Sequence, residues 1–463
     1  MYDDTIAAIS TAPGRAAIAV VRISGPDSVA IASALLGECP PKRRATLSWV
    51  THPETGERVD RALVTYFPAP NSYTGEEMLE LSCHGGILTP QLVLDAALAG
   101  GARQAEPGEF TRRAYLKGKL DLLQAEAILD LIDGRSPAQH RAALHQLDRG
   151  LSRRIEELRE AIVGCEALLV YEIDFPEEDE GPVPPHRIGA AAGEVIARLD
   201  ALLSTAEEGE LIREGVVTVI AGRPNAGKSS LFNALCGAER AIVTEEPGTT
   251  RDAVEAVVSL AGFPFRLVDT AGLRETEQPI ERIGIEVAQR YLRGADVILF
   301  CAEAGRALEA EEAAFLERMG AKTVFLIRTK SDLISPASPA AAEELEKERT
   351  GSSRRLLTGE LTLSTRGGSG IADLRDALVD SLFSGSIRAE AATPLVTRRR
   401  HARGLRRARE EVGAFLSARS RGVPPEVAAT HLRTAAHELE ELLGVIAPDD
   451  VLARVFEDFC IGK

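Results

Sequence analysis

The chain has 463 residues, 44% of them hydrophobic, and a formal net charge of −16 at pH 7. This length suggests roughly three domains, and the hydrophobic content is enough for each domain to bury a core. The negative charge argues against a protein that coats nucleic acid non-specifically, and no apolar run approaches the ~18 to 20 residues of a membrane-spanning helix.

The cysteines and the N-terminus predict a cytoplasmic protein with no membrane partner. Six cysteines occur singly, without a Cys-x-x-Cys pair or a His/Cys cluster. This usage argues against a zinc site and a disulfide framework, and favours a reducing compartment. The first residues, Met1-Tyr2-Asp3-Asp4, are acidic and lead directly into a strand-like run, so no signal peptide is visible.

Two segments precede the most informative motif of the chain. Residues 1–118 combine alternating apolar runs, such as 17–23, with Gly/Pro turns, and this pattern predicts a compact α+β domain. Residues 119–212 predict the first half of an α-helical domain, because apolar side chains recur there at three- and four-residue spacing. An acidic, proline-bearing loop is expected at 174–185, followed by one helical run from Ile188 to Leu211.

Residues 222–229 read Gly-Arg-Pro-Asn-Ala-Gly-Lys-Ser, between a β-branched run and a helix start. Strand, glycine-rich turn and helix are the context of a phosphate-binding loop, in which backbone N–H groups at a helix N-terminus meet phosphate oxygens. Lys228 would reach the β- and γ-phosphates, and the Ser229 hydroxyl would ligate Mg²⁺. The residues expected to contact the nucleotide here are Asn225, Ala226, Gly227, Lys228, Ser229 and Ser230.

Apolar strands then alternate with helices, which predicts an α/β domain with a mainly parallel sheet. One strand ends in Asp269-Thr270-Ala271-Gly272, where a P-loop hydrolase keeps an aspartate for the Mg²⁺ shell and a glycine N–H for the γ-phosphate. Between the two motifs, Gly248-Thr249-Thr250-Arg251-Asp252 offers Thr250 as a further Mg²⁺ ligand.

A third motif predicts which base is bound. In Thr329-Lys330-Ser331-Asp332, the Asp332 carboxylate can accept hydrogen bonds from guanine N1–H and its exocyclic amine, which adenine cannot offer. Thr329 stands where GTPases usually have Asn; its hydroxyl can hold the neighbouring loop but lacks an amide. Ser364-Thr365-Arg366 would supply the last base-contacting loop, and it departs from the usual Ser-Ala-Lys. Four motifs in order, at Ras-like spacing, predict GTP binding.

Two further positions indicate how hydrolysis would work. Leu273 stands where Ras-like enzymes keep the glutamine that orients water, so another group must do so, and Glu281 is the nearest plausible carboxylate. The amide oxygen of Asn225 is able to ligate a monovalent cation. No arginine finger is evident; Arg251 and Arg274 are candidates, although a structural role suits them better.

Helical periodicity resumes near residue 378 and runs to the end, so residues 379–463 are expected to complete the helical domain around an inserted domain at 213–378. A basic run from Arg398 to Arg409 fits a solvated helix face by its spacing. The predicted fold is an α+β N-terminal domain, a discontinuous α-helical domain, and an inserted α/β P-loop (Ras-like) GTPase domain.

Over essentially its whole length the chain resembles the MnmE family, also called TrmE, of tRNA-modification GTPases. The most specific marker is the C-terminal Phe459-Cys460-Ile461-Gly462-Lys463. Further markers are Pro13-Gly14-Arg15, Asn71-Ser72-Tyr73-Thr74-Gly75-Glu76, Cys83-His84-Gly85-Gly86, Pro107-Gly108-Glu109-Phe110-Thr111 and Gly118-Lys119-Leu120-Asp121-Leu122.

The resemblance implies a homodimer formed through an N-terminal domain that binds a 5-formyl- or 5,10-methylene-tetrahydrofolate one-carbon donor. Arg22, Glu80 and Lys119 match the folate-contacting positions, and the C-terminal signature with Lys463 reaches the same pocket. An Arg and a Lys can meet folate carboxylates, and a carboxylate suits the N–H donors of the pterin. Glu76 and Glu77 are the alternatives to Glu80.

The resemblance also implies that the GTPase domains dimerise with K⁺ bound, and that this cation substitutes for an arginine finger. Asn225, Thr244 and Thr249, together with backbone carbonyls near Glu246, match the K⁺-contacting region, and Glu281 matches the position that orients the water. Lys228 is the other catalytic candidate of the GTP site. The nucleotide-contacting loop would comprise Thr244, Glu245, Glu246, Pro247, Gly248, Thr249 and Thr250.

Members of this family work with an FAD-containing partner, MnmG, in a heterotetramer. Together they add a carboxymethylaminomethyl or aminomethyl group to C5 of the wobble uridine in tRNA. Cys460 is a candidate nucleophile, since a thiolate could attack the pyrimidine or carry the one-carbon unit. The alternative function is a regulatory GTPase of ribosome assembly, which would have no use for a one-carbon pocket.

Overall fold

The computed structural model describes residues 4–174, 185–238, 254–269, 289–333, 357–383, 395–446, 449–457 and 459–463. It divides into two compact units. Unit 1 comprises 1–129, 146–192 and 410–463, and unit 2 comprises 130–145 and 193–409. Among the helices of the described ranges, none is long and apolar enough to cross a membrane.

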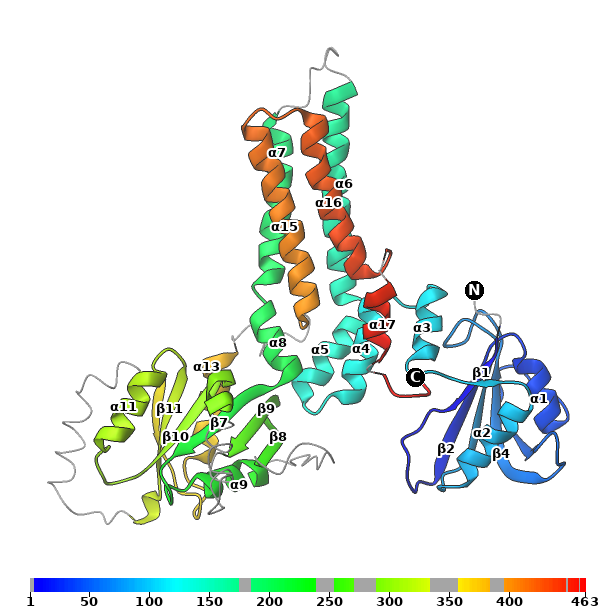
Figure 1. Ribbon diagram of the computed structural model, residues 1–463, viewed down its shortest axis with the longest axis horizontal. Coiled ribbons are helices and arrows are strands. Elements are labelled where there is room, and N and C mark those ends of the chain that lie inside the picture. The colour runs from blue at the N-terminus through cyan, green and yellow to red at the C-terminus, as the bar shows by residue number, and fades with distance from the viewer. Residues whose placement is uncertain are drawn as a thin grey trace. The chain divides into compact units, whose positions relative to one another are not determined.

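The first part of unit 1 is built on a six-stranded sheet in the order β3-β4-β5-β2-β1-β6 (Figure 1). All neighbouring strands are antiparallel except β1 and β6. The strands are β1 (Ile6–Ile9), β2 (Ile18–Ser24), β3 (Thr46–Thr51), β4 (Arg58–Phe67), β5 (Met78–His84) and β6 (Arg103–Gln104). Helices α1 (Ser28–Leu36) and α2 (Thr89–Ala99) contribute to the same apolar core as the sheet. This confirms the predicted α+β N-terminal domain.

Alternation along the strands gives this sheet two different faces. On β2, Val21 and Ile23 are fully buried in the apolar core, whereas Arg22 between them is directed to the opposite face. On β5, Leu79 and Leu81 are buried in the same way on either side of Glu80. The second face therefore carries Arg22 and Glu80.

The helical part of unit 1 joins segments from both ends of the chain. It contains α3 (Glu109–Leu116), α6 (Gly150–Asp174), α16 (Pro425–Leu443), α17 (Asp449–Glu457) and parts of α4 (Leu122–Asp133) and α5 (Pro137–Leu147). Helices α6 and α16 lie side by side (Figure 1), and Arg159 of α6 pairs with Glu440 of α16. The two helices come from opposite sides of the inserted domain, which confirms that the helical domain is discontinuous.

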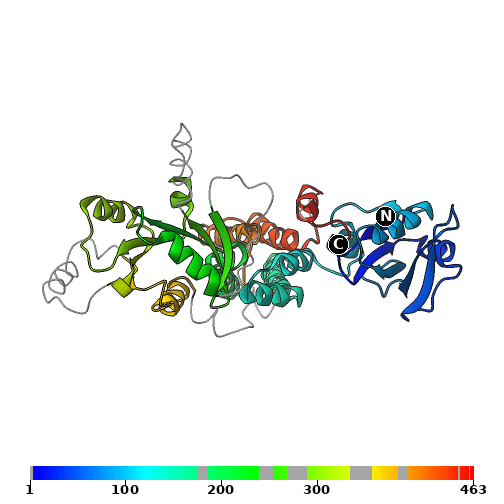
Figure 2. The same cartoon turned by 90° about the horizontal axis from the view of Figure 1, so that it is seen from below.

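The last residues of the chain lie against the N-terminal domain (Figure 2). Ile461 forms a β-bridge with Pro107, and the Phe110 N–H donates to the Lys463 carbonyl at 3.1 Å. Gly462 has φ of 95°, and a Cβ on it would lie 2.3 Å from the Ile9 carbonyl oxygen. Only glycine allows this close approach.

Unit 2 contains a second six-stranded sheet, in the order β12-β11-β10-β7-β9-β8. All its neighbouring strands are parallel except β8 and β9. The strands are β7 (Val216–Gly222), β8 (Val254–Leu260), β9 (Phe263–Asp269), β10 (Val297–Glu303), β11 (Thr323–Thr329) and β12 (Gly359–Thr362). One face packs on α9 (Lys228–Ala238) and α13 (Ile371–Leu382), and the other on α11 (Ala310–Met319). This confirms the α/β P-loop domain; the expected boundary at residue 378 falls inside α13.

One predicted helix is in fact two. The run expected from Ile188 to Leu211 divides into α7 (Pro185–Leu203) and α8 (Ala206–Glu214). At the break, the Ser204 hydroxyl donates to the Ala201 carbonyl at 2.8 Å and the Thr205 hydroxyl to the Leu202 carbonyl at 2.7 Å. Such local hydroxyl bonds compete with helical backbone bonding. The loop expected at 174–185 lies almost entirely outside the described residues.

The basic run forms the start of α15 (Arg399–Ser420), and several of its arginines are in ion pairs. Arg398 pairs with Asp130 at 2.7 Å, and Arg409 pairs with Asp200 at 2.6 Å. Arg399 pairs with a glutamate of α8. At these three positions the positive charge is neutralised within the protein.

Candidate functional site

The residues 222–229 form a loop whose backbone requires small residues. Gly222 has φ of 140°, and a Cβ there would lie 2.4 Å from the Cys301 carbonyl oxygen of β10. Gly227 has φ of 84°, and Asn225 adopts φ of 63°, a left-handed conformation that asparagine tolerates better than most residues. The loop leads into α9, so its backbone N–H groups lie at a helix N-terminus, as anion binding requires.

Two side chains predicted to belong to an Mg²⁺ site lie together. The Ser229 hydroxyl donates to Oδ2 of Asp269 at 2.8 Å, although the residues are 40 positions apart. A hydroxyl and a carboxylate at this separation are oxygen ligands of the kind that Mg²⁺ prefers. Lys228 Nζ donates to the Arg223 carbonyl at 2.7 Å, which places the ammonium group over the phosphate-binding loop. The arrangement fits a Mg²⁺–nucleotide complex.

Two of the residues predicted to recognise the base, Asp332 and Ser364, also lie together. The Ser364 hydroxyl donates to Oδ1 of Asp332 at 2.6 Å, and this hydrogen bond lowers the pKa of Asp332 below its ordinary value. The carboxylate is therefore ionised at neutral pH and accepts hydrogen bonds. Lys330 adopts φ of 59° and pairs with Glu303 at the end of β10. Thr365 and Arg366 follow in the same loop as Ser364.

Thr329 links the base-recognition motif to the phosphate-binding loop. Its buried hydroxyl donates to the Ala226 carbonyl at 2.8 Å, and the Ala302 carbonyl lies 3.3 Å away. A Cβ on Gly227 would lie 3.3 Å from the Thr329 side chain, so the two loops are packed closely. The Thr329 hydroxyl has one proton to donate, and it holds the phosphate-binding loop through that hydrogen bond.

Replacing Thr329 with valine keeps its shape and removes this tether. We expect Thr329→Val to lower GDP and GTP affinity about three- to tenfold, the value of one buried hydrogen bond. The preference for guanine over other bases should not change, because Asp332 is untouched. Titration with fluorescent nucleotides measures both quantities, with Thr329→Ser as the control that keeps the hydroxyl. Equal affinities for Thr329→Val and wild type would exclude the tether.

Several predicted site residues lie outside the described part of the chain. They are Thr244, Glu245, Glu246, Pro247, Gly248, Thr249, Thr250, Thr270, Ala271, Gly272 and Glu281. Their expected roles stay predictions.

A second polar cluster lies on the other face of the N-terminal sheet. Arg22 and Glu80 are partners in the β2–β5 register, and their side chains form an ion pair at 2.8 Å. The Arg22 guanidinium lies 5.1 Å from the ring centroid of Tyr73 and 5.6 Å from that of Phe110. The pair keeps access to solvent, with side chains 15% and 28% exposed. It offers a cation, a carboxylate and two aromatic rings.

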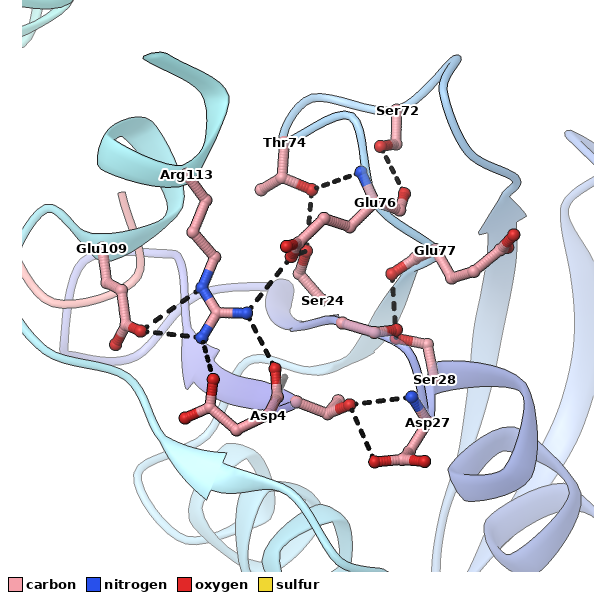
Figure 3. A network of polar contacts seen from close by, with 12 residues as sticks. Asp4, Ser24, Asp27, Ser28, Ser72, Thr74, Glu76, Glu77, Glu109 and Arg113 are labelled. Carbon is pink, nitrogen blue, oxygen red and sulfur yellow. Dashed lines mark hydrogen bonds and ion pairs between the residues drawn. The ribbon is translucent and has the colours of Figure 1, made fainter. Parts of the chain in front are cut away.

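The neighbouring glutamates have other partners. Glu76 is buried and accepts hydrogen bonds from Ser24 at 3.0 Å and from Arg113 at 3.2 Å (Figure 3). Glu77 accepts a hydrogen bond from Tyr66, and burial together with this bond raises the pKa of Tyr66 to about 12. Of the three glutamates considered, Glu80 alone lies beside Arg22.

Of the remaining predicted residues of this cluster, Lys463 contacts Phe110 and Lys119 contacts Pro70. Phe110, whose ring lies under Arg22, donates its N–H to Lys463, so the C-terminus reaches the same neighbourhood. The exposed Cys460 accepts a backbone hydrogen bond from Gly108 at 3.4 Å. Lys119 Nζ donates to the Pro70 carbonyl at 3.0 Å. Sequence reasoning did not assign a role to the two aromatic rings, although both lie in motifs that marked the family.

Comparisons with known proteins cover the whole chain. A family described as GTP-binding protein TrmE N-terminus matches residues 5–119, and one described as MnmE helical domain matches residues 122–460. The tRNA modification GTPase MnmE of Moorella thermoacetica is 40% identical over 470 residues, which is 100% of both chains. The protein of the same name from Geobacter metallireducens is 39% identical, again over 100% of both.

Among solved structures, that of Aquifex aeolicus Era bound to GDP.AlF4- is 27% identical to this chain. The alignment covers 36% of this chain and 57% of that one, with a TM-score of 0.29. The match to the two MnmE relatives therefore extends over more of this chain than the match to this structure.

Proposed function

The chain belongs to the MnmE family of tRNA modification GTPases, and on that premise we propose the chemistry that its GTP hydrolysis serves. The protein is a GTP hydrolase with a tRNA substrate. We propose that it acts with an FAD-containing partner, MnmG, to install a carboxymethylaminomethyl or aminomethyl group at C5 of the wobble uridine. The observation that carries this proposal is that the chain holds, besides the Ser229–Asp269 contact in unit 2, an Arg22–Glu80 cluster in unit 1.

We propose that this cluster binds 5-formyl- or 5,10-methylene-tetrahydrofolate. The Glu80 carboxylate suits the N–H donors of a pterin, and Tyr73 and Phe110 offer flat surfaces for its ring. Arg22 and Lys119 are cations that suit folate carboxylates. When bound, the folate supplies the one-carbon unit; the side chains named here bind and orient it. Cys460 is exposed, so its thiol is accessible to a bound substrate.

Nucleoside analysis of tRNA tests the proposal. Cells that lack the protein should lose the C5 modification of wobble uridine, and wild-type protein should restore it. Glu80→Gln, which keeps the shape of the side chain but removes its charge, should restore at least about tenfold less modified uridine. Its GTPase rate should equal that of wild type, since the nucleotide site is untouched. Unchanged wobble uridine in the deletion strain would favour the ribosome-assembly alternative.

We propose that GTP hydrolysis depends on K⁺, with Asn225, Thr244, Glu246 and Thr249 around the ion and Glu281 orienting the attacking water. Asn225 supports this, since it carries an amide oxygen at an exposed position of the phosphate-binding loop. Replacing Na⁺ with K⁺ should raise GTP turnover at least about tenfold, or about 1.4 kcal/mol of activation free energy.

Asn225→Gly is the matched variant for this measurement. Glycine accepts the φ of 63° and removes only the amide. The ratio of the rates in K⁺ and in Na⁺ should fall toward one in this variant. A wild-type protein with equal rates in the two salts would defeat the K⁺ proposal.

We propose further that the protein is a cytoplasmic homodimer through its N-terminal domain, and that it forms a heterotetramer with MnmG. Exposed apolar side chains on β3 and β4 support an interface: Leu47, Trp49 and Leu63 are 54%, 44% and 45% exposed. The same proposal divides the chain into four segments, 1–118, 119–212, 213–378 and 379–463. Light scattering of the purified protein measures the mass, and a monomer at micromolar concentration would contradict the dimer.

A further inference from the structure

The turn between β8 and β9 is docked on the first turn of helix α5. The Ala138 N–H donates to the Gly262 carbonyl at 2.9 Å. Ala138 is buried in the same apolar cluster as Leu260 and Phe263, the residues that flank the turn. A helix from the helical domain thus shares the core of the nucleotide-binding sheet.

The β8–β9 hairpin is a stiff element. Its strands pair without a register break from Val254 opposite Asp269 to Leu260 opposite Phe263. Ala261 and Gly262 both have positive φ, 47° and 88°, which is the two-residue turn that matches the twist of the strands. At about 3.4 Å per residue, seven paired residues reach about 20 Å.

The two ends of this hairpin lie at different sites. Asp269, the last residue of β9, accepts the Ser229 hydroxyl at the predicted Mg²⁺ position. The Gly262 carbonyl at the other end holds Ala138. A change in the Ser229–Asp269 contact on binding Mg²⁺ and nucleotide is thereby connected, through one strand, to α5.

A polar junction joins the α4–α5 turn region to the residues just before β7 and just before α15. Gln139 accepts the Arg135 N–H at 2.8 Å and donates to the Arg213 carbonyl at 2.9 Å, just before β7. Asp130 of α4 accepts Arg213 at 3.2 Å and Arg398, just before α15, at 2.7 Å. All these residues belong to unit 2.

From this junction, helices continue into the rest of the protein. Helices α4, α5, α7 and α15 each have residues in both units. Within unit 1, Gln124 of α4 donates to the Leu147 carbonyl at 2.8 Å, and Gln146 of α5 donates to the Leu123 carbonyl at 2.8 Å. The two helices are therefore hydrogen-bonded to each other at the ends remote from their turn.

We propose that the β8–β9 hairpin is a lever that couples the nucleotide state at Ser229 and Asp269 to the α4–α5 turn, with Ala138 as its contact and Asp130 as its anchor. The proposal rests on the proposed function, because it requires a nucleotide at the phosphate-binding loop. Ala138 and Asp130 are positioning residues in this proposal, and neither is assigned a contact with the nucleotide.

Hydrogen exchange of the full-length protein tests the lever. In wild type, amide exchange over residues 139–145 should differ about tenfold between the GDP complex and the complex with a non-hydrolysable GTP analogue and Mg²⁺. In Ala138→Pro the difference should fall below about twofold, because proline lacks the N–H yet is tolerated in the first turn of a helix. GDP affinity should stay within about threefold of wild type.

Two more variants complete the test. Asp130→Asn removes the anchoring charge without a change in size and should also reduce the nucleotide-dependent difference, which keeps the lever testable if Ala138→Pro does not fold. Arg141→Ala, at an exposed position of the same helix, should leave it intact. A full difference in Ala138→Pro, or in Asp130→Asn, would overturn the lever. If wild-type protein binds nucleotide normally but shows the same amide exchange in the GDP and GTP-analogue complexes, the lever alone is overturned. If wild-type protein does not bind nucleotide, the proposed function is overturned as well.

Discussion

Asp332→Asn should lower the affinity for GDP and GTP about 10²- to 10⁴-fold and transfer the preference to xanthine nucleotides. We propose that the wild-type carboxylate accepts hydrogen bonds from two guanine donors, and a mismatch at such a site leaves polar groups unpaired and lowers affinity by orders of magnitude. Asparagine presents one acceptor and one donor, and the 2-oxo group of xanthine accepts from that donor. The Ser364 hydroxyl, 2.6 Å from Asp332, orients the side chain in either form.

Displacement of a bound fluorescent nucleotide by GDP or by xanthosine diphosphate (XDP) measures the relative affinity for the two bases. Ser364→Ala is the matched control, because it removes the orienting hydroxyl and leaves the carboxylate. It should lower GDP affinity only about tenfold or less and should not favour XDP. If Asp332→Asn bound GDP as wild type does, Asp332 would not be the residue that selects guanine.

The nucleotide site was largely predictable from the sequence because its chemistry is carried by short, contiguous motifs. Gly222 and Gly227 are required by the path of one loop, and Asp269 and Asp332 lie at or just after the ends of strands that apolar runs mark clearly. The contact between Ser229 and Asp269 then follows from the parallel order of β7 and β9. What the motifs did not show was the function of Thr329, whose tether depends on packing against Gly227.

Contacts between distant segments were not predictable in the same way. The docking of Ala138 on Gly262 joins a helix and a hairpin turn that no motif connects. The division of one helical run at Ser204 and Thr205 depends on local hydroxyl bonds, which apolar periodicity does not report. The placement of Phe110 under Arg22 required the fold as well.

The largest structural feature that sequence reasoning missed is the network around Arg113 (Figure 3). The Arg113 side chain is fully buried and pairs with Glu109 at 2.9 Å, Glu76 at 3.2 Å and Asp4 at 2.8 Å. The contact with Asp4 spans 109 positions in the sequence. These bonds hold together Asp4, the loop before β5 and helix α3. Tyr73 of that loop and Phe110 of α3 carry the two rings beside Arg22.

Arg113→Met should therefore destabilise the N-terminal domain by about 3–5 kcal/mol, because it leaves buried carboxylates without their cation. Arg103→Met is the control, since Arg103 pairs with the same Glu109 but is 42% exposed, and it should cost about 1 kcal/mol or less. Adding Glu76→Gln and Glu109→Gln to Arg113→Met should recover part of the loss by removing the buried charges. Urea denaturation at pH 7 measures all three variants.

The pH dependence separates lost charge pairing from lost packing. Burial, the largest influence, raises the pKa of Glu109, but hydrogen bonds from Arg103, the Glu106 N–H and Arg113 outweigh it and hold that pKa below its ordinary value. A carboxyl whose pKa is lowered by folding stabilises the fold above its unfolded pKa of about 4.3, and this contribution is lost as the pH falls through the folded-state value. The stability difference between wild type and Arg113→Met should therefore shrink as the pH is lowered from 7 toward 4 and below. A difference that stays constant over this range would mean that Arg113 stabilises the domain by packing and not by its charge.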